Sequence, residues 1–298
     1  MGVFDQAARF STRADPEAVL RRLLPKGESL LFREWLDTRK LPLPGGGDRT
    51  ADLVAALDAA ERAEPWLVVF EFESHPDDDK IDVTLEEVSA FRNRVRHSKG
   101  KYRVTAALVY LTGRGLDLLD MTFADGSGTR HAPLVWNVAG DDAASTLEAV
   151  AAGEMSWGKL FWVPLMARGD EEGVIRRWHE VVTGIVTDAR IQQNIAEVAI
   201  IFADLAGRFL AWERVLKEWK MTESMVVNTW IERAQIKSQL EERRSSLLEL
   251  LRLKFPGKVS EEIAKLVDQQ SDLDLLRTWF RAAAQVPTMD DFVKGLRG

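Results

Sequence analysis

Cysteine is absent from this chain of 298 residues. Disulfide bonds and metal centres held by thiolates are therefore excluded, and we expect a protein of the reducing cytoplasm. No apolar run approaches the roughly 18–20 residues that cross a bilayer, and the N-terminal segment lacks the basic-then-apolar layout of a secretory signal. The sequence also has no P-loop motif and no nucleophile elbow. These absences predict a soluble, cytoplasmic protein with no membrane partner.

Acidic residues outnumber basic ones, 47 to 40, so the formal net charge is −7. Such a balance does not favour generic binding of nucleic acid. One segment reverses it, since residues 92–103 contain no acid and carry six cations: Arg92, Arg94, Arg96, Lys99, Lys101 and Arg103. A local basic run can follow a phosphate backbone even on an acidic protein. The other interpretation is a solvated helix end, where cations suit the helix dipole.

The strongest pattern in the chain is the stretch from Trp66 to Phe72, which is apolar on both faces apart from Glu71 and is followed directly by Glu73. A stretch of this kind is typical of a central strand covered on both faces. Side chains alternate along a strand, so Glu71 and Glu73 point to the same face, roughly 7 Å apart. Asp52, on a second expected strand, adds a third carboxylate. Buried carboxylates need a cation, and hard oxygen ligands favour Mg²⁺ or Mn²⁺.

A second interpretation stays open for these three carboxylates. They could lie at a solvent-exposed strand end, or they could form ion pairs with Arg49 and Lys80. A Glu-x-Glu pair on a strand is common in proteins that bind no metal. The side chain of Lys80 could also turn towards the metal site itself.

The segments that follow indicate a strand–helix–strand unit. Thr84 and Glu87 have the spacing of a capping box, which predicts a helix over residues 85–97. A second doubly apolar run over residues 102–112 predicts another buried strand. This arrangement favours parallel pairing through a crossover. Farther on, Leu118–Phe123 and Leu134–Val138 flank a turn-rich segment and predict a hairpin.

From Gly169 the strand pattern ends and helical periodicity takes over. Apolar residues then recur at alternating spacings of three and four: Ile195, Val198, Phe202, Leu205, Phe209, Trp212, Leu216 and Trp219. This seam serves a bundle within the chain or a homodimer equally well. We therefore expect an α/β domain over residues 1–169, with a mixed central sheet flanked by helices, and an all-α region over residues 170–298.

Several short motifs occur in order along the first half of the chain: Phe4-Asp5, Thr50-Ala-Asp52, Val69-Phe-Glu71-Phe-Glu73-Ser, and Val104 through Tyr110-Leu-Thr-Gly113. Together they resemble the Rpn/YhgA-like family of recombination-promoting nucleases and transposase-like proteins. The resemblance covers residues 1–170 approximately. The segment 245–292 is similar to a small helical module of unknown function attached to such proteins. Membership implies a restriction-endonuclease-like fold of the PD-(D/E)XK nuclease superfamily.

The resemblance also implies a role for each carboxylate in metal-dependent DNA cleavage. Asp52 would be the first ligand of Mg²⁺ or Mn²⁺, and Glu71 the second. Glu73 stands where the superfamily has lysine, and it would orient water or share a second metal ion. The phosphate contacts would come from the basic run, that is from Arg92, Arg94, Arg96, Lys99 and Lys101. A homodimer would supply the two active sites that double-strand cutting asks for.

Because Glu73 stands in place of the lysine, a function of another class stays open. A carboxylate at position 73 adds negative charge beside the phosphate, so the site could be weakened or inactive. The chain would then be an interaction protein that keeps a nuclease fold and acts through its helical C-terminal region. Binding of Mn²⁺ through Asp52 would separate the two hypotheses.

Overall fold

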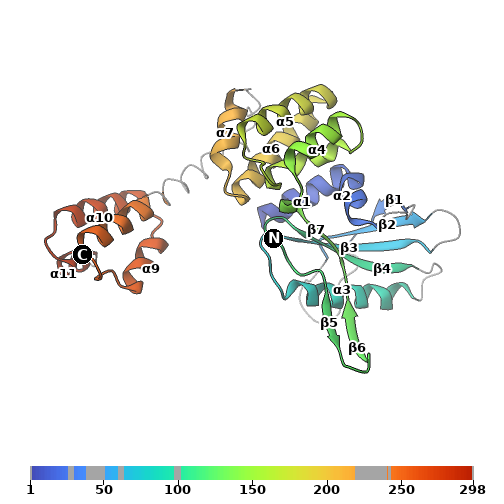
Figure 1. Cartoon of the computed structure of the whole chain (residues 1–298), viewed down its shortest axis with the longest axis horizontal. Helices are drawn as coiled ribbons and strands as arrows, with labels where there is room; N and C mark the ends of the chain where they lie inside the picture. Colours follow the sequence, from blue (N-terminus) through green and yellow to red (C-terminus); the bar gives the residue numbers. More distant parts are fainter. Residues whose placement is uncertain are drawn as a thin grey trace. The chain divides into compact units, whose positions relative to one another are not determined.

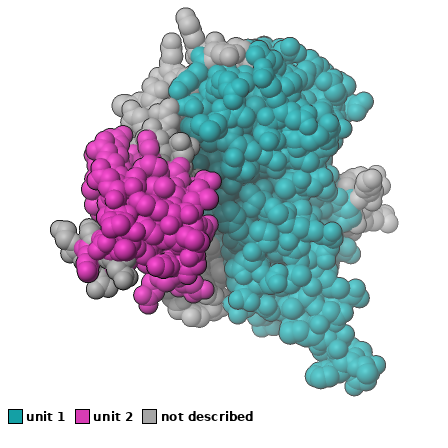
Figure 2. All heavy atoms as spheres, turned by 60° about the vertical axis from the view of Figure 1, so that its left-hand side comes forward, with its two compact units in different colours: residues 1–224 teal, residues 225–298 magenta. Residues whose placement is uncertain are grey.

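The structure is a computed structural model, and it describes residues 2–25, 30–37, 51–59, 64–96, 102–218, 240 and 243–296. The chain divides into two compact units, Met1–Ser224 and Met225–Gly298, which Figure 2 distinguishes by colour. Within the described ranges, no helix is both long and apolar enough to cross a membrane.

The first unit is built on a mixed sheet of five strands in the order β1-β2-β3-β4-β7. The strands are β1 (Leu30–Trp35), β2 (Leu53–Ala59), β3 (Trp66–Glu73), β4 (Arg103–Tyr110) and β7 (Leu134–Asn137). Strands β1, β2 and β3 are antiparallel neighbours, whereas β4 and β7 continue the sheet parallel to β3. Helix α3 (Lys80–Val95) supplies the crossover that parallel neighbours need. The expected α/β fold with a mixed central sheet is confirmed.

Strand β3 lies at the centre and is covered on both faces (Figure 1). Val69 packs with Phe91 of α3 on one face. On the other face the ring of Phe72 stacks on Trp162, with ring centroids 6.5 Å apart. Helices α1 (Val3–Ala14) and α2 (Pro16–Leu23) lie on this second side. Coverage of both faces explains the largely apolar character of this strand in the sequence.

The remaining helical segments of the first unit share a core with the sheet. They are η2 (Val138–Gly140), α4 (Ala143–Ala151), η3 (Trp157–Phe161), η4 (Val163–Leu165), α5 (Glu172–Ile185), α6 (Ala189–Leu205) and α7 (Phe209–Glu218). Phe202 of α6 lies 5.3 Å from Trp162, and Trp178 of α5 lies 4.9 Å from Trp212 of α7, between ring centroids. The last described strand ends at Asn137, well before the expected boundary near residue 170, and the compact division falls after Ser224.

Helix α3 begins earlier than the expected helix over residues 85–97. Its N-cap is Asp79, and the turn before it is closed by a hydrogen bond from Asp79 N to Asp77 Oδ1 at 3.1 Å. Thr84 therefore lies inside the helix and does not cap it. Its hydroxyl donates to Ile81 O at 2.8 Å and contacts His131 Nε2 at 3.0 Å. The aspartate-rich loop thus supplies the helix start.

Two other expectations were wrong in detail. Strand β5 (Leu119–Thr122) pairs with β6 (Gly128–His131), and Leu134–Asn137 joins the central sheet as β7. Burial decides this pairing, because Trp136 of β7 is fully buried. The helical seam is interrupted as well, since Gly207 adopts a φ of 71° between α6 and α7. Its last member, Trp219, lies outside the described residues.

The second unit is helical throughout its described part. It contains a helix over residues 243–254, α9 (Glu261–Gln269), α10 (Leu273–Gln285) and α11 (Met289–Leu296). Its own apolar core includes Leu251, Trp279 and Phe292. Two cations bind carbonyl groups at helix ends: Arg244 donates to Gln270 O at 2.9 Å, and Lys254 donates to Ala283 O at 2.9 Å. The expected helical character of the C-terminal region is confirmed.

Candidate functional site

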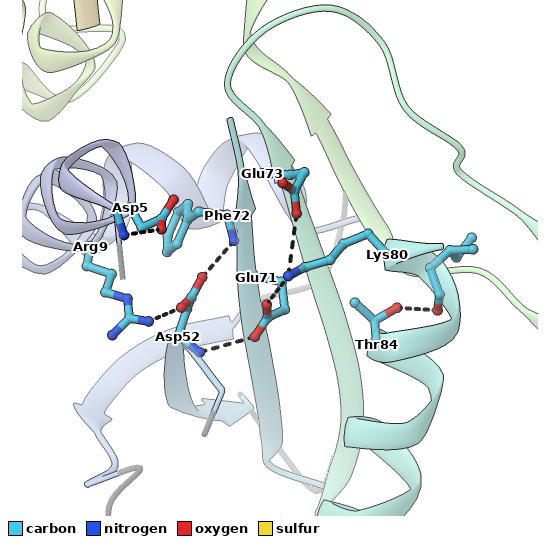
Figure 3. A network of polar contacts seen from close by, with 10 residues as sticks. Asp5, Arg9, Asp52, Glu71, Phe72, Glu73, Lys80 and Thr84 are labelled. Atoms are coloured by element: carbon cyan, nitrogen blue, oxygen red, sulfur yellow. Dashed lines mark hydrogen bonds and ion pairs between the residues drawn. The ribbon is translucent and has the colours of Figure 1, made fainter. Parts of the chain in front are cut away.

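The three predicted carboxylates lie together where β2 begins and β3 ends (Figure 3). Leu53 pairs with Phe70, and continuing this register by one residue places Asp52 across from Glu71. Residues directly opposite each other share a face of the sheet. The backbone fixes the pair, because Asp52 N donates to Glu71 Oε1 at 3.2 Å and Phe72 N donates to Asp52 Oδ2 at 3.0 Å. The structure therefore brings Asp52 and Glu71 together.

Lys80, the first residue of α3, reaches the same carboxylates. Its Nζ lies 2.8 Å from Glu71 Oε2 and 3.4 Å from Glu73 Oε2. Burial is the largest influence on its pKa and lowers it, but the two carboxylates together outweigh burial and raise the pKa above its ordinary value. Lys80 is therefore charged at neutral pH. The ion-pair interpretation is confirmed for Lys80, whereas Arg49 lies outside the described residues.

Glu73 responds to the same lysine differently. Burial raises the pKa of its carboxyl group, and the nearby ammonium of Lys80 lowers it by less. The geometry gives the reason, because Lys80 Nζ lies closer to Glu71 than to Glu73. The side chain of Glu71 is 7% exposed and that of Glu73 is 23% exposed. Glu73 therefore takes up a proton more readily than an ordinary glutamate.

Helix α1 contributes two charged residues: Asp5, which belongs to the Phe4-Asp5 motif, and Arg9, which the sequence did not single out. The guanidinium of Arg9 donates to Asp52 Oδ1 (Figure 3). Burial lowers the pKa of Arg9, although a guanidinium stays charged in proteins. Asp5 lies one turn earlier on the same face of the helix and accepts a hydrogen bond from Gly2 N at 3.0 Å. For Arg9, its spacing of four residues from Asp5 was the only signal in the sequence.

The predicted phosphate-binding residues do not gather at this edge. Arg92, Arg94 and Arg96 are exposed at the C-terminal end of α3, whereas Lys80 begins that helix. With a rise of about 1.5 Å per residue, Lys80 and Arg94 lie about 20 Å apart along the helix axis. Lys99 and Lys101 lie outside the described residues. Any phosphate contacts at this end of α3 would therefore be remote from the carboxylates.

The ends of β3 and β4 are tied together beside the site. Thr112 Oγ1 donates to Ser74 O at 2.6 Å and contacts His75 Nδ1 at 3.1 Å. Gly113 adopts a φ of 65°, and a Cβ at this position would lie 2.6 Å from Pro76 Cγ. Glycine therefore permits a conformation and a close approach that other residues would strain. These contacts hold the strand end that carries Glu71 and Glu73.

The carboxylate oxygens at this edge are the side-chain atoms that could coordinate a divalent metal ion. Across the part of the chain that the structure describes, no group of three or more His, Cys, Asp or Glu side chains is gathered to hold a metal. Mg²⁺ asks for less, because one or two carboxylates with water and substrate phosphates complete its coordination. Asp52 and Glu71 meet this need as neighbours on adjacent strands. The donor set therefore fits Mg²⁺ or Mn²⁺, provided that Arg9 and Lys80 yield some of the carboxylate oxygens.

Comparison of this chain with protein-family models, with curated proteins and with solved structures gives no match. The resemblance to nucleases therefore rests on the motifs of the sequence.

Proposed function

We propose that this protein is a metal-dependent endonuclease that hydrolyses phosphodiester bonds in DNA. The observation that carries the proposal is the position of Lys80, whose Nζ lies 2.8 Å from Glu71. A cation at the N-terminus of a helix opposes the helix dipole, so helix formation does not account for a lysine there. The resemblance to PD-(D/E)XK nucleases calls for a lysine beside two acidic ligands, and Glu73 leaves that role open. Lys80 takes it from α3.

Asp52 and Glu71 would hold the metal ion. When bound, Mg²⁺ or Mn²⁺ polarises the scissile phosphate and lowers the pKa of water. The charged ammonium of Lys80 would stabilise the negative charge that develops on the phosphate. Glu73, whose pKa is raised by burial, would orient the attacking water and accept its proton. The acidic residue at position 73 and the lysine at position 80 thus divide the work that one lysine does elsewhere in the superfamily.

The surroundings of the site support DNA as the substrate only in part. The exposed Arg92, Arg94 and Arg96 would contact phosphates remote from the cleaved bond, together with Lys99 and Lys101. A distance of about 20 Å along α3 corresponds to roughly six base pairs of a duplex with a rise of 3.4 Å. A bound duplex could therefore span both positions. A homodimer would allow double-strand cutting, in recombination or in the movement of mobile elements.

Cleavage of supercoiled plasmid in Mg²⁺ and in Mn²⁺ tests the proposal. We expect nicking or linearisation by the wild type and its loss in Asp52→Ala, Glu71→Gln and Lys80→Ala. Two exposed residues of the second unit provide matched controls, Glu262→Gln for the loss of a carboxylate and Lys265→Ala for the loss of an ammonium. Both controls should cut as the wild type does. Equal cutting by all variants would overturn the assignment of the site.

A second candidate function is favoured by one observation. Arg9 and Lys80 already neutralise Asp52 and Glu71, as expected for a nuclease fold that has lost its metal and acts as an interaction module. The helical C-terminal region would then be the working part. Failure of the wild type to cut DNA in either metal, with no binding of Mn²⁺, would favour this function.

A further inference from the structure

Arg9 occupies an oxygen of Asp52 that the proposed metal ion would need. One terminal nitrogen of its guanidinium pairs with Asp52 Oδ1. The Nε of the same guanidinium is buried and has no hydrogen-bond partner among the described residues. The contact is therefore single, and it lacks the second parallel hydrogen bond of a bidentate arginine–carboxylate pair.

We propose that Arg9 is a placeholder, which neutralises Asp52 in the metal-free protein and is displaced when a divalent cation binds. This inference rests on the proposed function, because it assumes that Asp52 is a metal ligand. Arg9 is a positioning residue in this scheme. It sets the affinity of the site for metal through competition for one carboxylate.

Electrostatics makes the two occupants of Asp52 exclusive. The side chain of Asp52 is 13% exposed, and a carboxylate so far removed from water needs a cationic partner. A divalent ion and a guanidinium on the same carboxylate would repel each other at short range. One of them must leave, and the metal-free protein keeps the arginine.

The structure offers Arg9 a place to go. Asp5 lies one turn earlier on the same face of α1, and its negative charge attracts the guanidinium of Arg9, which partly opposes the lowering of the Arg9 pKa by burial. The displaced guanidinium would also remain beside the site, where a substrate phosphate could bind it. Lys80 differs, because it bridges two carboxylates and keeps Glu73 when a metal ion takes Glu71.

Titration calorimetry of the full chain with Mn²⁺ tests the placeholder. The variants are Arg9→Gln, Arg9→Lys and Arg13→Gln, with Asp52→Ala as the reference without the ligand. Arg13 is exposed and lies one turn beyond Arg9 on α1, so its variant controls for the general loss of one positive charge. Arg9→Lys keeps the charge and protects the test if the neutral variant does not fold.

We expect Arg9→Gln to bind Mn²⁺ about tenfold more tightly than the wild type, which corresponds to about 1.4 kcal/mol. Arg9→Lys should bind with intermediate affinity, because a more strongly hydrated ammonium replaces the planar guanidinium. Arg13→Gln should stay within about twofold of the wild type, since an exposed charge is screened. Binding by Arg9→Gln that is much more than tenfold tighter than the measurable binding of the wild type would support the placeholder in its strongest form.

Two results would overturn the inference. The first is compatible with the proposed nuclease function, whereas the second contradicts it as well. Metal binding by the wild type with equal or weaker binding by both Arg9 variants removes the placeholder and keeps the proposed nuclease. Absence of metal binding from the wild type and every Arg9 variant removes both.

Discussion

Two lysines of the first unit are largely withdrawn from water, and they behave in opposite ways. Lys80 lies between Glu71 and Glu73, and its pKa is raised above the ordinary value. Lys159 of η3 is 5% exposed, and burial lowers its pKa to about 8. Its Nζ lies 3.9 Å from the ring centroid of Trp136 and has no hydrogen-bond partner among the described residues. Burial lowers the pKa of both lysines, but it does not by itself decide whether the final pKa lies above or below the ordinary value.

The difference lies in how far the nearby carboxylates are already occupied. Asp15 accepts a hydrogen bond from Gly158 N at 2.9 Å, and Asp141 accepts one from Trp136 Nε1 at 2.8 Å. Asp141 also pairs with Arg22 at 3.0 Å. These acids raise the pKa of Lys159 too little to offset burial. Lys159 is left with the face of an aromatic ring, a weaker partner than a carboxylate.

The edge around Lys80 has acids in excess. Asp5, Asp52, Glu71 and Glu73 interact there with Arg9 and Lys80. Four acids and two cations meet at this edge, whereas the two acids beside Lys159, Asp15 and Asp141, are matched by two cations, Lys159 and Arg22. This contrast is the physical reason to look for a metal ion at one lysine and a structural role at the other.

The largest expected effect comes from replacing each of the two lysines by methionine. Lys80→Met should abolish DNA cutting and lower the free energy of unfolding by about 3 kcal/mol, because it leaves the buried Glu71 without its closest cation. Lys159→Met should keep cutting near the wild-type rate, since Lys159 contacts none of the three carboxylates. Urea denaturation of the metal-free proteins and plasmid cleavage measure the two effects. Comparable loss of cutting in both variants would erase the distinction between the lysines.

Lys159→Met should also stabilise the protein in a way that depends on pH. The folded-state pKa of Lys159 is about 8, below the ordinary 10.5. Its charged form is disfavoured in the folded state, so stability is reduced at neutral pH and recovers as the pH rises from about 8 to about 10.5. The gain of the variant over the wild type should reach at most about 3 kcal/mol at pH 7. Unfolding at pH 7 and at pH 10 measures it, and a gain that does not shrink at pH 10 would contradict the prediction.

Glu73→Gln should separate stability from activity. Burial raises the pKa of Glu73, so its ionisation costs stability as the pH rises through its ordinary value near 4.5 towards the raised value. The variant should therefore be more stable than the wild type at neutral pH and equal to it below pH 4.5. Cutting should fall about 100-fold, as expected for the loss of a general base. Thermal melts across this pH range, set beside cleavage rates, measure both. Unchanged cutting would remove Glu73 from the chemistry.

The sequence predicted the parts of this edge that follow from local pattern. The stretch from Trp66 to Phe72 identifies a central strand because burial on both faces leaves Glu71 as its only polar residue. The period of two then places Glu71 and Glu73 on one face. Asp52 was expected on a second strand of the sheet. The structure confirms that it lies beside Glu71.

The parts that the sequence missed depend on contacts between distant segments. Arg9 and Asp52 are 43 residues apart in the chain, and no periodicity of α1 specifies which strand its charged face will meet. The short run Leu134–Val138 could pair with any neighbour, and the burial of Trp136 in the core decided for β4. Long-range packing therefore supplied the partners of the site, whereas local pattern supplied its carboxylates.

The smallest expected effect on stability comes from Asp142, whose pKa is shifted mainly by hydrogen bonds and by Arg168 and not by burial. The pKa of Asp142 is lowered to about 2, first by the hydrogen bond from Ser145 N at the start of α4 and then by Arg168. The stability that it contributes is present above the ordinary pKa of 3.8 and is lost as the pH falls to about 2. Asp142→Asn keeps a good N-cap and removes only the charge. The melting temperature of the variant should therefore be slightly lower than that of the wild type at pH 7. The two melting temperatures should converge as the pH is lowered from 3.8 to about 2. A difference that stays constant with pH would assign the effect to the cap geometry and not to the charge.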